Sequence, residues 1–263
     1  MTDERVAAIR QLWTDGDYAA VGEGFRAVAD HVVDDHVRPG ARVLDAATGT
    51  GNLAIAAARA GAKVDAFDLT PSLLDEARRR AEAEGLAIGF VEGDLVDVPF
   101  PDASFDLVAS TFGAFLADDP GRCAAELVRV ARPGGRVVAT AWAPGSMYVE
   151  MTQLAERLGP ETIPHGGPSP WADPGQLGAL TAELPVSLAV TTHELWLPFA
   201  SPDDALAFYE RTSGPVQRMA GALEDAWPEA RAAIVDRWGE LAEDRGDHVA
   251  LPATYTVATL ERT

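Results

Sequence analysis

The stretch Val43-Leu44-Asp45-Ala46-Ala47-Thr48-Gly49-Thr50-Gly51 decides the fold of this chain. A short apolar run ends in an acid, and the glycines that follow lead directly into Asn52-Leu53-Ala54-Ile55. Glycine tolerates positive φ and lets a ligand approach the backbone, while the first turn of a helix presents free N–H groups. The stretch therefore predicts a strand, a tight turn and a helix start that together form a binding site.

The residues around this stretch alternate between short apolar runs and amphipathic segments. Such alternation predicts a parallel sheet with helices on both faces, the α/β class. Within residues 40–142 the expected strands are Arg42–Asp45, Lys63–Phe67, Ile88–Glu92, Phe105–Ser110 and Arg136–Trp142. The expected helices are Asn52–Arg59, Ser72–Glu84 and Arg122–Val130, the last closed by a turn at Arg132-Pro133-Gly134-Gly135.

Two further regions flank this core, and no linker separates autonomous domains. Residues 1–39 carry helical spacing broken at Asp15-Gly16-Asp17, which predicts an N-terminal helical cover. Residues 143–263 are expected to complete the sheet and to add helical insertions that cap a substrate site. The strands expected there, which should pair with each other, lie near 186–198 and 253–261.

The composition argues against several classes of partner. A formal net charge of −20, from 41 acidic and 21 basic residues, repels nucleic-acid phosphates and anionic membranes. No apolar run approaches the roughly 18 residues of a membrane span, and the N-terminus lacks a secretory pattern. We therefore expect a cytoplasmic protein that acts on a small molecule. The sequence leaves its oligomeric state open, with a homodimer as one possibility.

Other features of the composition narrow the chemistry. The single cysteine, Cys123, can form no disulfide within the chain. No cluster of His, Asp and Glu has the spacing of metal ligands, so no metal is expected. Of the 21 basic residues only Lys63 is a lysine, which is typical of a high-GC bacterial genome.

The glycines of the opening stretch leave two classes of ligand open. Gly49-x-Gly51-x-x-Ala54 also satisfies the dinucleotide fingerprint, and Asp68 follows at about the distance of a ribose-binding acid. By this criterion a nicotinamide enzyme has to be considered.

Two more acids separate these classes. Asp45, where the first strand ends, would repel a pyrophosphate and attract a ligand that carries an ammonium group. Asp94, which follows the third expected strand, can accept a hydrogen bond from an adenine amino group, for which a nicotinamide enzyme has no standing need. S-adenosylmethionine has an amino group, a ribose and an adenine, so the three acids suit this ligand.

Residues 40–142 resemble the core of class I S-adenosylmethionine-dependent methyltransferases, of the broad group that includes the ubiquinone and menaquinone C-methyltransferases. The resemblance is carried by VLDAATGTGNLAI, VDAFDLTPSLLDEAR, VEGDLVDVPFPDASFDLVAS and ELVRVARPGGRVV. It implies a Rossmann-like, doubly wound sheet of seven strands with the last one antiparallel. Ala47 departs from the common pattern Asp-x-Gly-x-Gly-x-Gly by replacing its first glycine, as is frequent in small-molecule methyltransferases.

The resemblance also implies where the cofactor binds. The methionine part would lie among Asp45, Ala46, Gly49 and Gly51, near the backbone carbonyl of Ser110. The nucleoside would lie against Asp68 and Leu69, with Asp94 and Leu95 completing the adenine site. Tyr18 is expected to close over the methionine tail, and Phe115, together with Phe112, to wall the place where the methyl group is delivered.

The expected activity is metal-independent transfer of a methyl group from S-adenosylmethionine to oxygen, nitrogen or carbon of a small metabolite. S-adenosylhomocysteine is the expected product of the cofactor. A role in natural-product tailoring is a hypothesis. Because alignment alone accelerates such a displacement, a base is not obligatory. For a hydroxyl acceptor, His165 is the candidate base. Two alternatives stay open: a protein of this fold that binds the cofactor for another activity or as a partner subunit, and a NAD-dependent oxidoreductase.

Overall fold

The computed structural model describes residues 3–158 and 169–263. Contacts divide the chain into two compact units. The sheet unit consists of Gly22–Ala141, Pro170–Thr191 and Val257–Thr263. The helical unit consists of the described residues of Met1–Val21, Trp142–Ser169 and Thr192–Thr256.

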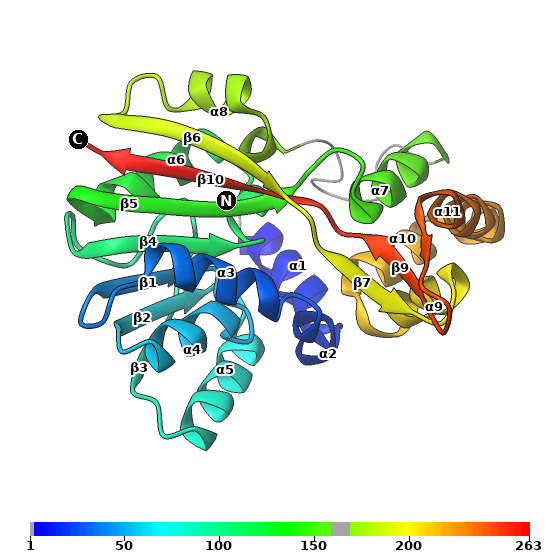
Figure 1. Cartoon of the computed structure of the whole chain (residues 1–263), viewed down its shortest axis with the longest axis horizontal. Helices are drawn as coiled ribbons and strands as arrows, with labels where there is room; N and C mark the ends of the chain where they lie inside the picture. The colour runs from blue at the N-terminus through cyan, green and yellow to red at the C-terminus, as the bar shows by residue number, and fades with distance from the viewer. Residues whose placement is uncertain (1–2, 159–168) are drawn as a thin grey trace. The chain divides into compact units, whose positions relative to one another are not determined.

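A seven-stranded sheet has the order β3-β2-β1-β4-β5-β10-β6. Its strands are β1 (Arg42–Ala46), β2 (Lys63–Asp68), β3 (Ile88–Glu92), β4 (Phe105–Thr111), β5 (Ala131–Trp142), β6 (Val186–His193) and β10 (Tyr255–Arg262). The pairs among β1 to β5 are parallel, and the arrow of β10 runs against its neighbours in Figure 1. The predicted Rossmann-like sheet with one antiparallel strand is confirmed.

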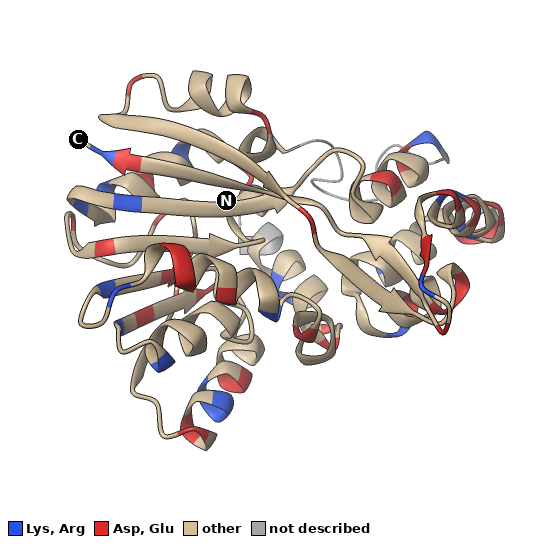
Figure 2. Cartoon of the chain, in the orientation of Figure 1, with Lys and Arg blue, Asp and Glu red and all other residues tan. Residues whose placement is uncertain are grey.

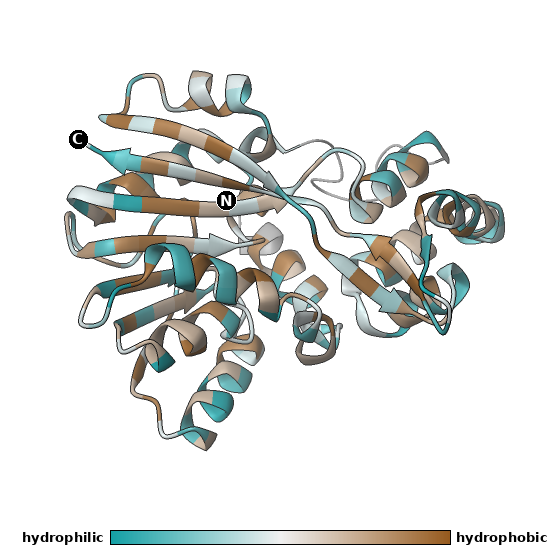
Figure 3. Ribbon diagram, viewed as in Figure 1, coloured by the Kyte–Doolittle hydropathy of each residue, from teal (hydrophilic) through white to brown (hydrophobic). Residues whose placement is uncertain are grey.

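Helices connect the strands of the sheet unit. They are α3 (Arg26–His36), α4 (Asn52–Arg59), α5 (Pro71–Ala83), η1 (Ala114–Leu116), α6 (Pro120–Val130), η2 (Pro170–Ala172) and α8 (Pro174–Leu180). Asp119 accepts from the Arg122 amide at 2.9 Å and Asp173 from the Gln176 amide at 2.8 Å, so a capping acid followed by proline starts α6 and α8. Figure 3 shows hydrophobic residues along the strands and on one side of the helices.

The core of the sheet unit lies between the central strands and their helices. Leu44, Phe67, Phe105 and Leu127 are fully buried there. β1 shows why the chain forms a central parallel strand, because its last four residues are all buried. Asp45 is the fourth of the five residues of β1 and lies next to the end of the strand.

The helical unit contains α1 (Asp3–Thr14), α7 (Met147–Leu158), α9 (Pro202–Thr212), α10 (Gly214–Leu223), η3 (Glu224–Ala226) and α11 (Trp227–Leu241), with a small sheet of order β7-β9-β8. The small strands are β7 (Trp196–Phe199), β9 (Val249–Pro252) and β8 (Glu243–Asp244), and α2 spans Tyr18–Glu23. Tyr209 packs edge-on against Tyr148 and Trp238, whose indole donates to the Met147 carbonyl at 3.0 Å. Aromatic packing therefore supplies much of the core of this unit.

The predicted strand 186–198 is wrong as a single element, because it divides into β6 and β7. The predicted strand 253–261 corresponds to β10, which begins two residues later, at Tyr255. The expected pairing of these two stretches is confirmed in the large sheet, where β10 adjoins β6, while β7 pairs antiparallel with β9 in the small sheet. Near the division the Ala253 amide still donates to the Leu195 carbonyl at 2.7 Å.

β5 begins at Ala131, five residues before its predicted start. Ala131 pairs with Phe105, the register then shifts, and Arg136 pairs with Leu107. The predicted turn at Arg132-Pro133-Gly134-Gly135 is therefore an irregularity inside the strand. Gly134 takes a φ of 74°, which glycine allows without strain.

Charged residues lie mainly on helices and loops, and the strands of the large sheet are mostly uncharged (Figure 2). No helix in residues 3–158 or 169–263 combines the length and the apolar character needed to cross a membrane.

Candidate functional site

The turn after β1 is built on residues with positive φ. Gly49 has a φ of 53° and Gly51 of 88°, and the Gly51 amide closes the turn by donating to the Thr48 carbonyl at 2.9 Å. A Cβ on Gly51 would lie 3.1 Å from the Cβ of Ala77, whereas a Cβ on Gly49 would meet nothing within 4 Å. Gly51 therefore allows α4 to approach α5, and Gly49 leaves open space beside the backbone.

Ala47 shares this backbone conformation without being glycine. Its φ is 56°, a region that costs an L-residue with a Cβ about 1–2 kcal/mol. The common family pattern has glycine here, so the turn keeps its glycine-like shape despite the alanine side chain.

Asp45 is 1% exposed and holds the start of α4. Its Oδ2 accepts from the Thr48 hydroxyl at 2.6 Å and from the Ala54 amide at 2.9 Å. Its Oδ1 is buried and has no hydrogen-bond partner in the part of the chain that the structure describes. Burial raises the pKa of Asp45 to about 7, against the lowering effect of these two donors.

Asp68, where β2 ends, joins the turn to the second strand. Its Oδ2 accepts from the Gly49 amide at 2.8 Å and its Oδ1 from the Thr70 amide at 2.9 Å. Burial raises the pKa of Asp68, while both backbone donors lower it. Each carboxylate oxygen has a second lone pair, so Asp68 can hold the turn and still accept from a ligand.

Asp94 lies two residues after β3 in a tight turn. Its Oδ1 accepts from the Val96 amide at 3.0 Å, and its carbonyl accepts from the Asp97 amide at the same distance. The preceding Gly93 amide donates to the Asp68 carbonyl at 3.0 Å. Asp94 is half-buried, as are Leu69 and Leu95.

Ser110, near the end of β4, ties this strand to β1. Its hydroxyl donates to the Ala46 carbonyl at 2.7 Å and accepts from the Ala114 amide at 2.9 Å. The prediction concerned its backbone carbonyl, and the structure adds this structural role for its side chain. Phe115 in η1 is partly buried against the core of the sheet unit.

Two predicted site residues, Tyr18 and His165, do not belong to the described part of the sheet unit. Tyr18 belongs to the helical unit, where its hydroxyl accepts from the Gly214 amide at 3.1 Å and its ring lies 5.0 Å from that of Trp13. Burial raises the pKa of Tyr18. His165 lies outside the described residues, and both assignments stay predictions.

Sequence reasoning missed two residues that shape the turns. Arg80 on α5 donates from Nη1 to the Thr50 carbonyl at 2.6 Å and to the Thr50 hydroxyl at 3.0 Å. A Cβ on Gly113, after β4, would lie 2.5 Å from the Cβ of Ala47. Arg80 follows Ala77 by three residues, so helical spacing alone places both on one face of α5.

The three acids lie at or near the carboxyl ends of neighbouring strands, with Asp94 just after β3, Asp68 at the end of β2 and Asp45 near the end of β1. Parallel strands bring their carboxyl ends to one edge, which is the ligand crevice of open α/β sheets. This row of acceptors suits an elongated ligand that presents hydrogen-bond donors. A pyrophosphate would instead meet the carboxylate of Asp45.

The family described as "Methyltransferase domain" matches residues 43–135. The uncharacterized protein Rv1403c of Mycobacterium tuberculosis is 34% identical over 251 residues, an alignment that covers 92% of this chain and 91% of that protein. Demethylmenaquinone methyltransferase of Thermus thermophilus is 45% identical over 105 residues, covering 39% of this chain and 48% of the enzyme.

Solved structures share the fold at lower identity. The YcgJ protein of Bacillus subtilis is 19% identical with a TM-score of 0.61, and the match covers 90% of this chain and 98% of that chain. The [4+2]-cyclase SpnF is 17% identical with a TM-score of 0.56, with 90% and 80% covered.

Proposed function

Because this chain belongs to the family of S-adenosylmethionine-dependent methyltransferases, we propose that it transfers a methyl group from S-adenosylmethionine to an oxygen, nitrogen or carbon atom of a small metabolite. The observation that carries the proposal is the row of acids where β1, β2 and β3 end. The product on the cofactor side is S-adenosylhomocysteine.

The residues of this edge fit the cofactor. The buried Oδ1 of Asp45, which has no partner within the described residues, is an acceptor suited to an ammonium group. The open space at Gly49 suits close approach of the ligand to the backbone. Asp68 would hold the ribose hydroxyls and Asp94 the adenine amino group, with Leu69 and Leu95 against the ring.

The chain's own residues orient the reactants. When bound, S-adenosylmethionine supplies a methyl group on a positively charged sulfur. The turn 47–51 would hold the methionine part, and Phe112 and Phe115 would line the place of methyl transfer. Alignment of the acceptor can supply several kcal/mol of the barrier lowering. For a hydroxyl acceptor, we assign His165 as the base that removes the proton.

The charge of the chain supports the proposed class of acceptor. A net charge of −20 disfavours binding of nucleic acids and anionic membranes, which favours a small molecule as the acceptor. A cytoplasmic location is part of the same proposal. A role in natural-product tailoring is inferred from the arginine-rich, high-GC composition alone.

A second candidate function is a reaction other than methyl transfer at the same cofactor site. It is favoured by one observation, the likeness of the fold to the [4+2]-cyclase SpnF. The cofactor would then be retained by the same acids without being consumed.

The test is incubation with S-adenosylmethionine and acceptors that carry hydroxyl, amine or activated carbon nucleophiles, with mass spectrometry of both products. We expect S-adenosylhomocysteine and an acceptor heavier by one methyl group to form in equal amounts. Conversion of an acceptor with S-adenosylmethionine left intact would favour the second candidate and contradict methyl transfer.

A further inference from the structure

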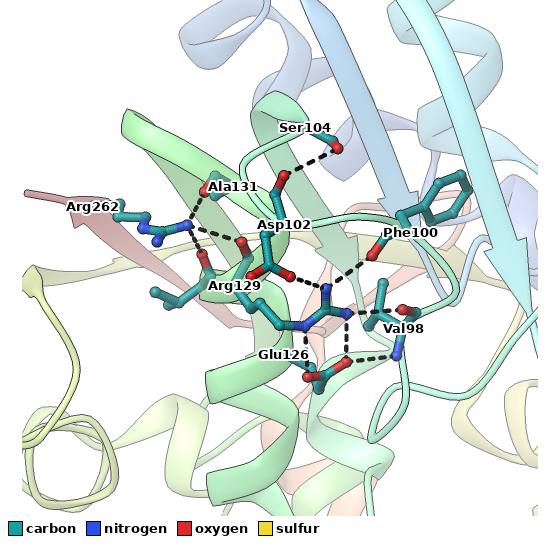
Figure 4. A network of polar contacts seen from close by, with 9 residues as sticks. Val98, Phe100, Asp102, Ser104, Glu126, Arg129, Ala131 and Arg262 are labelled. Carbon is teal, nitrogen blue, oxygen red and sulfur yellow. Dashed lines mark hydrogen bonds and ion pairs between the residues drawn. The ribbon is translucent and has the colours of Figure 1, made fainter.

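Arg129 on α6 clamps the loop that follows β3 (Figure 4). Its guanidinium donates all five N–H groups, with donor–acceptor distances of 2.7–2.9 Å. Nε and Nη2 donate to the carboxylate of Glu126, and Nη2 also donates to the Val98 carbonyl. Nη1 donates to the Phe100 carbonyl and to the carboxylate of Asp102. This fork is specific to arginine.

Glu126 completes the clamp from one turn earlier on α6. Its Oε2 accepts from the Val98 amide at 2.9 Å, so both backbone groups of Val98 are held by α6. The side chains of Glu126 and Arg129 are only 18% and 30% exposed. The bond to Arg129 lowers the pKa of Glu126, which keeps the pair charged at neutral pH.

Arg129 and Glu126 hold the C-terminal end of the turn that contains Asp94. The N-terminal end is held by the Gly93 amide, which donates to the carbonyl of Asp68. At the C-terminal end, Val98 is 3% exposed. The ring of Pro99 packs over Gly93, where a Cβ added to this glycine would lie 2.7 Å from the proline ring. Asp94 therefore lies in a short segment held at both ends, and its position depends on Val98.

We propose that Arg129 and Glu126 are positioning residues for adenine recognition, acting through Val98 on the place where the Asp94 carboxylate meets the adenine amino group. This inference rests on the adenine role given to Asp94 under the proposed function. The pair itself does not touch the ligand, and its effect is confined to the nucleobase.

Arg262 on β10 offers a matched control in the same view (Figure 4). Its Nη1 donates to the carbonyls of Val128, Arg129 and Ala131, at the end of α6. None of these acceptors belongs to the loop 93–102. Arg262 thus stabilises α6 without a hydrogen bond to the loop. Its substitution therefore distinguishes a loss of protein stability from a loss of positioning of the loop.

The test compares two ligands by calorimetry: S-adenosylhomocysteine and S-inosylhomocysteine, in which oxygen replaces the adenine amino group. We expect the unaltered protein to prefer S-adenosylhomocysteine by about tenfold or more, the scale of a hydrogen bond to a charged acceptor. In Arg129→Lys the preference should fall to within about threefold, because an ammonium group cannot replace the fork. In Arg262→Lys the preference should persist even where the melting temperature falls.

Each contrary result has a separate meaning. An unchanged preference in Arg129→Lys would overturn the positioning role and leave the cofactor site intact. A lack of preference in the unaltered protein would overturn the role of Asp94 and this inference with it. If Arg129→Lys does not fold, Glu126→Gln replaces it in the test, because glutamine keeps an acceptor for the Val98 amide. We expect Glu126→Gln to reduce the preference for S-adenosylhomocysteine. An unreduced preference in this variant would also overturn the inference.

Discussion

The backbone amide of Gly49 donates to Oδ2 of Asp68 over 2.8 Å, so the acid that ends β2 holds the turn that follows β1. The same carboxylate is the proposed partner of the ribose hydroxyls. Cofactor affinity and the shape of the turn are therefore linked through one side chain.

Asp68→Ala should weaken S-adenosylhomocysteine binding by at least about 1 kcal/mol, the scale of a lost hydrogen bond to a charged group. The loss should exceed that single bond because the Gly49 amide also loses its acceptor. Calorimetry measures the affinity, with Asp75→Ala as control, since Asp75 is 76% exposed and pairs with Arg78 on the surface of α5. Equal affinity in the two variants would contradict the ribose role.

Asp45 should make the stability of the protein depend on pH. Its pKa is about 7 in the folded chain and near its ordinary value of about 4 in the unfolded chain, so between these values the folded state binds more protons. The contribution of Asp45 to the free energy of unfolding should therefore fall as pH rises from about 4 to about 7. Above about pH 7, Asp45 should add little further pH dependence.

Asparagine at position 45 keeps an acceptor but cannot titrate. Urea unfolding at pH 5 and pH 8 should show a larger loss of stability in the unaltered protein than in Asp45→Asn. Asp68, whose pKa is also raised by burial, is present in both proteins, so the difference reports the titration of Asp45 together with its charge coupling to Asp68. A pH dependence that is the same in both would mean that Asp45 does not titrate in this range.

Ala47→Gly should raise the free energy of unfolding by about 1 kcal/mol, because it relieves the positive φ of 56°. Ala103→Gly is the matched comparison: its φ is 52°, and it lies on an exposed loop away from the turn. Both should stabilise the protein in urea titrations. Destabilisation by Ala47→Gly alone would show that the alanine methyl group contributes packing that outweighs the strain.

Gly113→Ala should destabilise the protein by about 1–3 kcal/mol, because the new Cβ would lie 2.5 Å from the Cβ of Ala47 and 2.9 Å from the Ser110 hydroxyl. Removal of the methyl group in Ala47→Gly should restore part of the loss. A double-mutant cycle in urea measures this coupling. Strict additivity of the two changes would contradict direct contact between positions 47 and 113.

Arg80→Ala should weaken S-adenosylhomocysteine binding several-fold, because the Thr50 carbonyl and hydroxyl lose the donor that holds the turn from α5. The adjacent Arg79 is 70% exposed and pairs with Glu76, so Arg79→Ala should bind as the unaltered protein does. Arg80→Lys, which keeps one donor, should recover part of the affinity. Weakening of the same size in both alanine variants would point to a general effect of charge.

The sheet and the row of acids were predictable because local signals agree with the fold. Around β1 a short apolar run, Asp45 near the end of the strand and the two glycines that follow all indicate a buried parallel strand that ends at a site. The start of α6 was predictable from Asp119 and Pro120, although periodicity alone placed it two residues late at Arg122.

Other features depend on contacts between distant residues. The stretch 186–198 divides at Glu194 and Leu195 because its two parts pair with different strands, β10 and β9. These strands lie about 60 residues later in the chain, so the local sequence pattern does not reveal the division. The capping role of Asp45 and the five bonds of Arg129 likewise need the folded chain. Arginine on a helix is ordinarily a surface residue, and only the loop that folds onto α6 gives this one its acceptors.

Calorimetric titration with S-adenosylhomocysteine, beside a titration with NADH, tests the central claim most directly. We expect saturable binding of S-adenosylhomocysteine at one site per chain and no binding of NADH, because the buried carboxylate of Asp45 beside the turn 47–51 would repel a pyrophosphate bound there. Binding of NADH without binding of S-adenosylhomocysteine would contradict the claim.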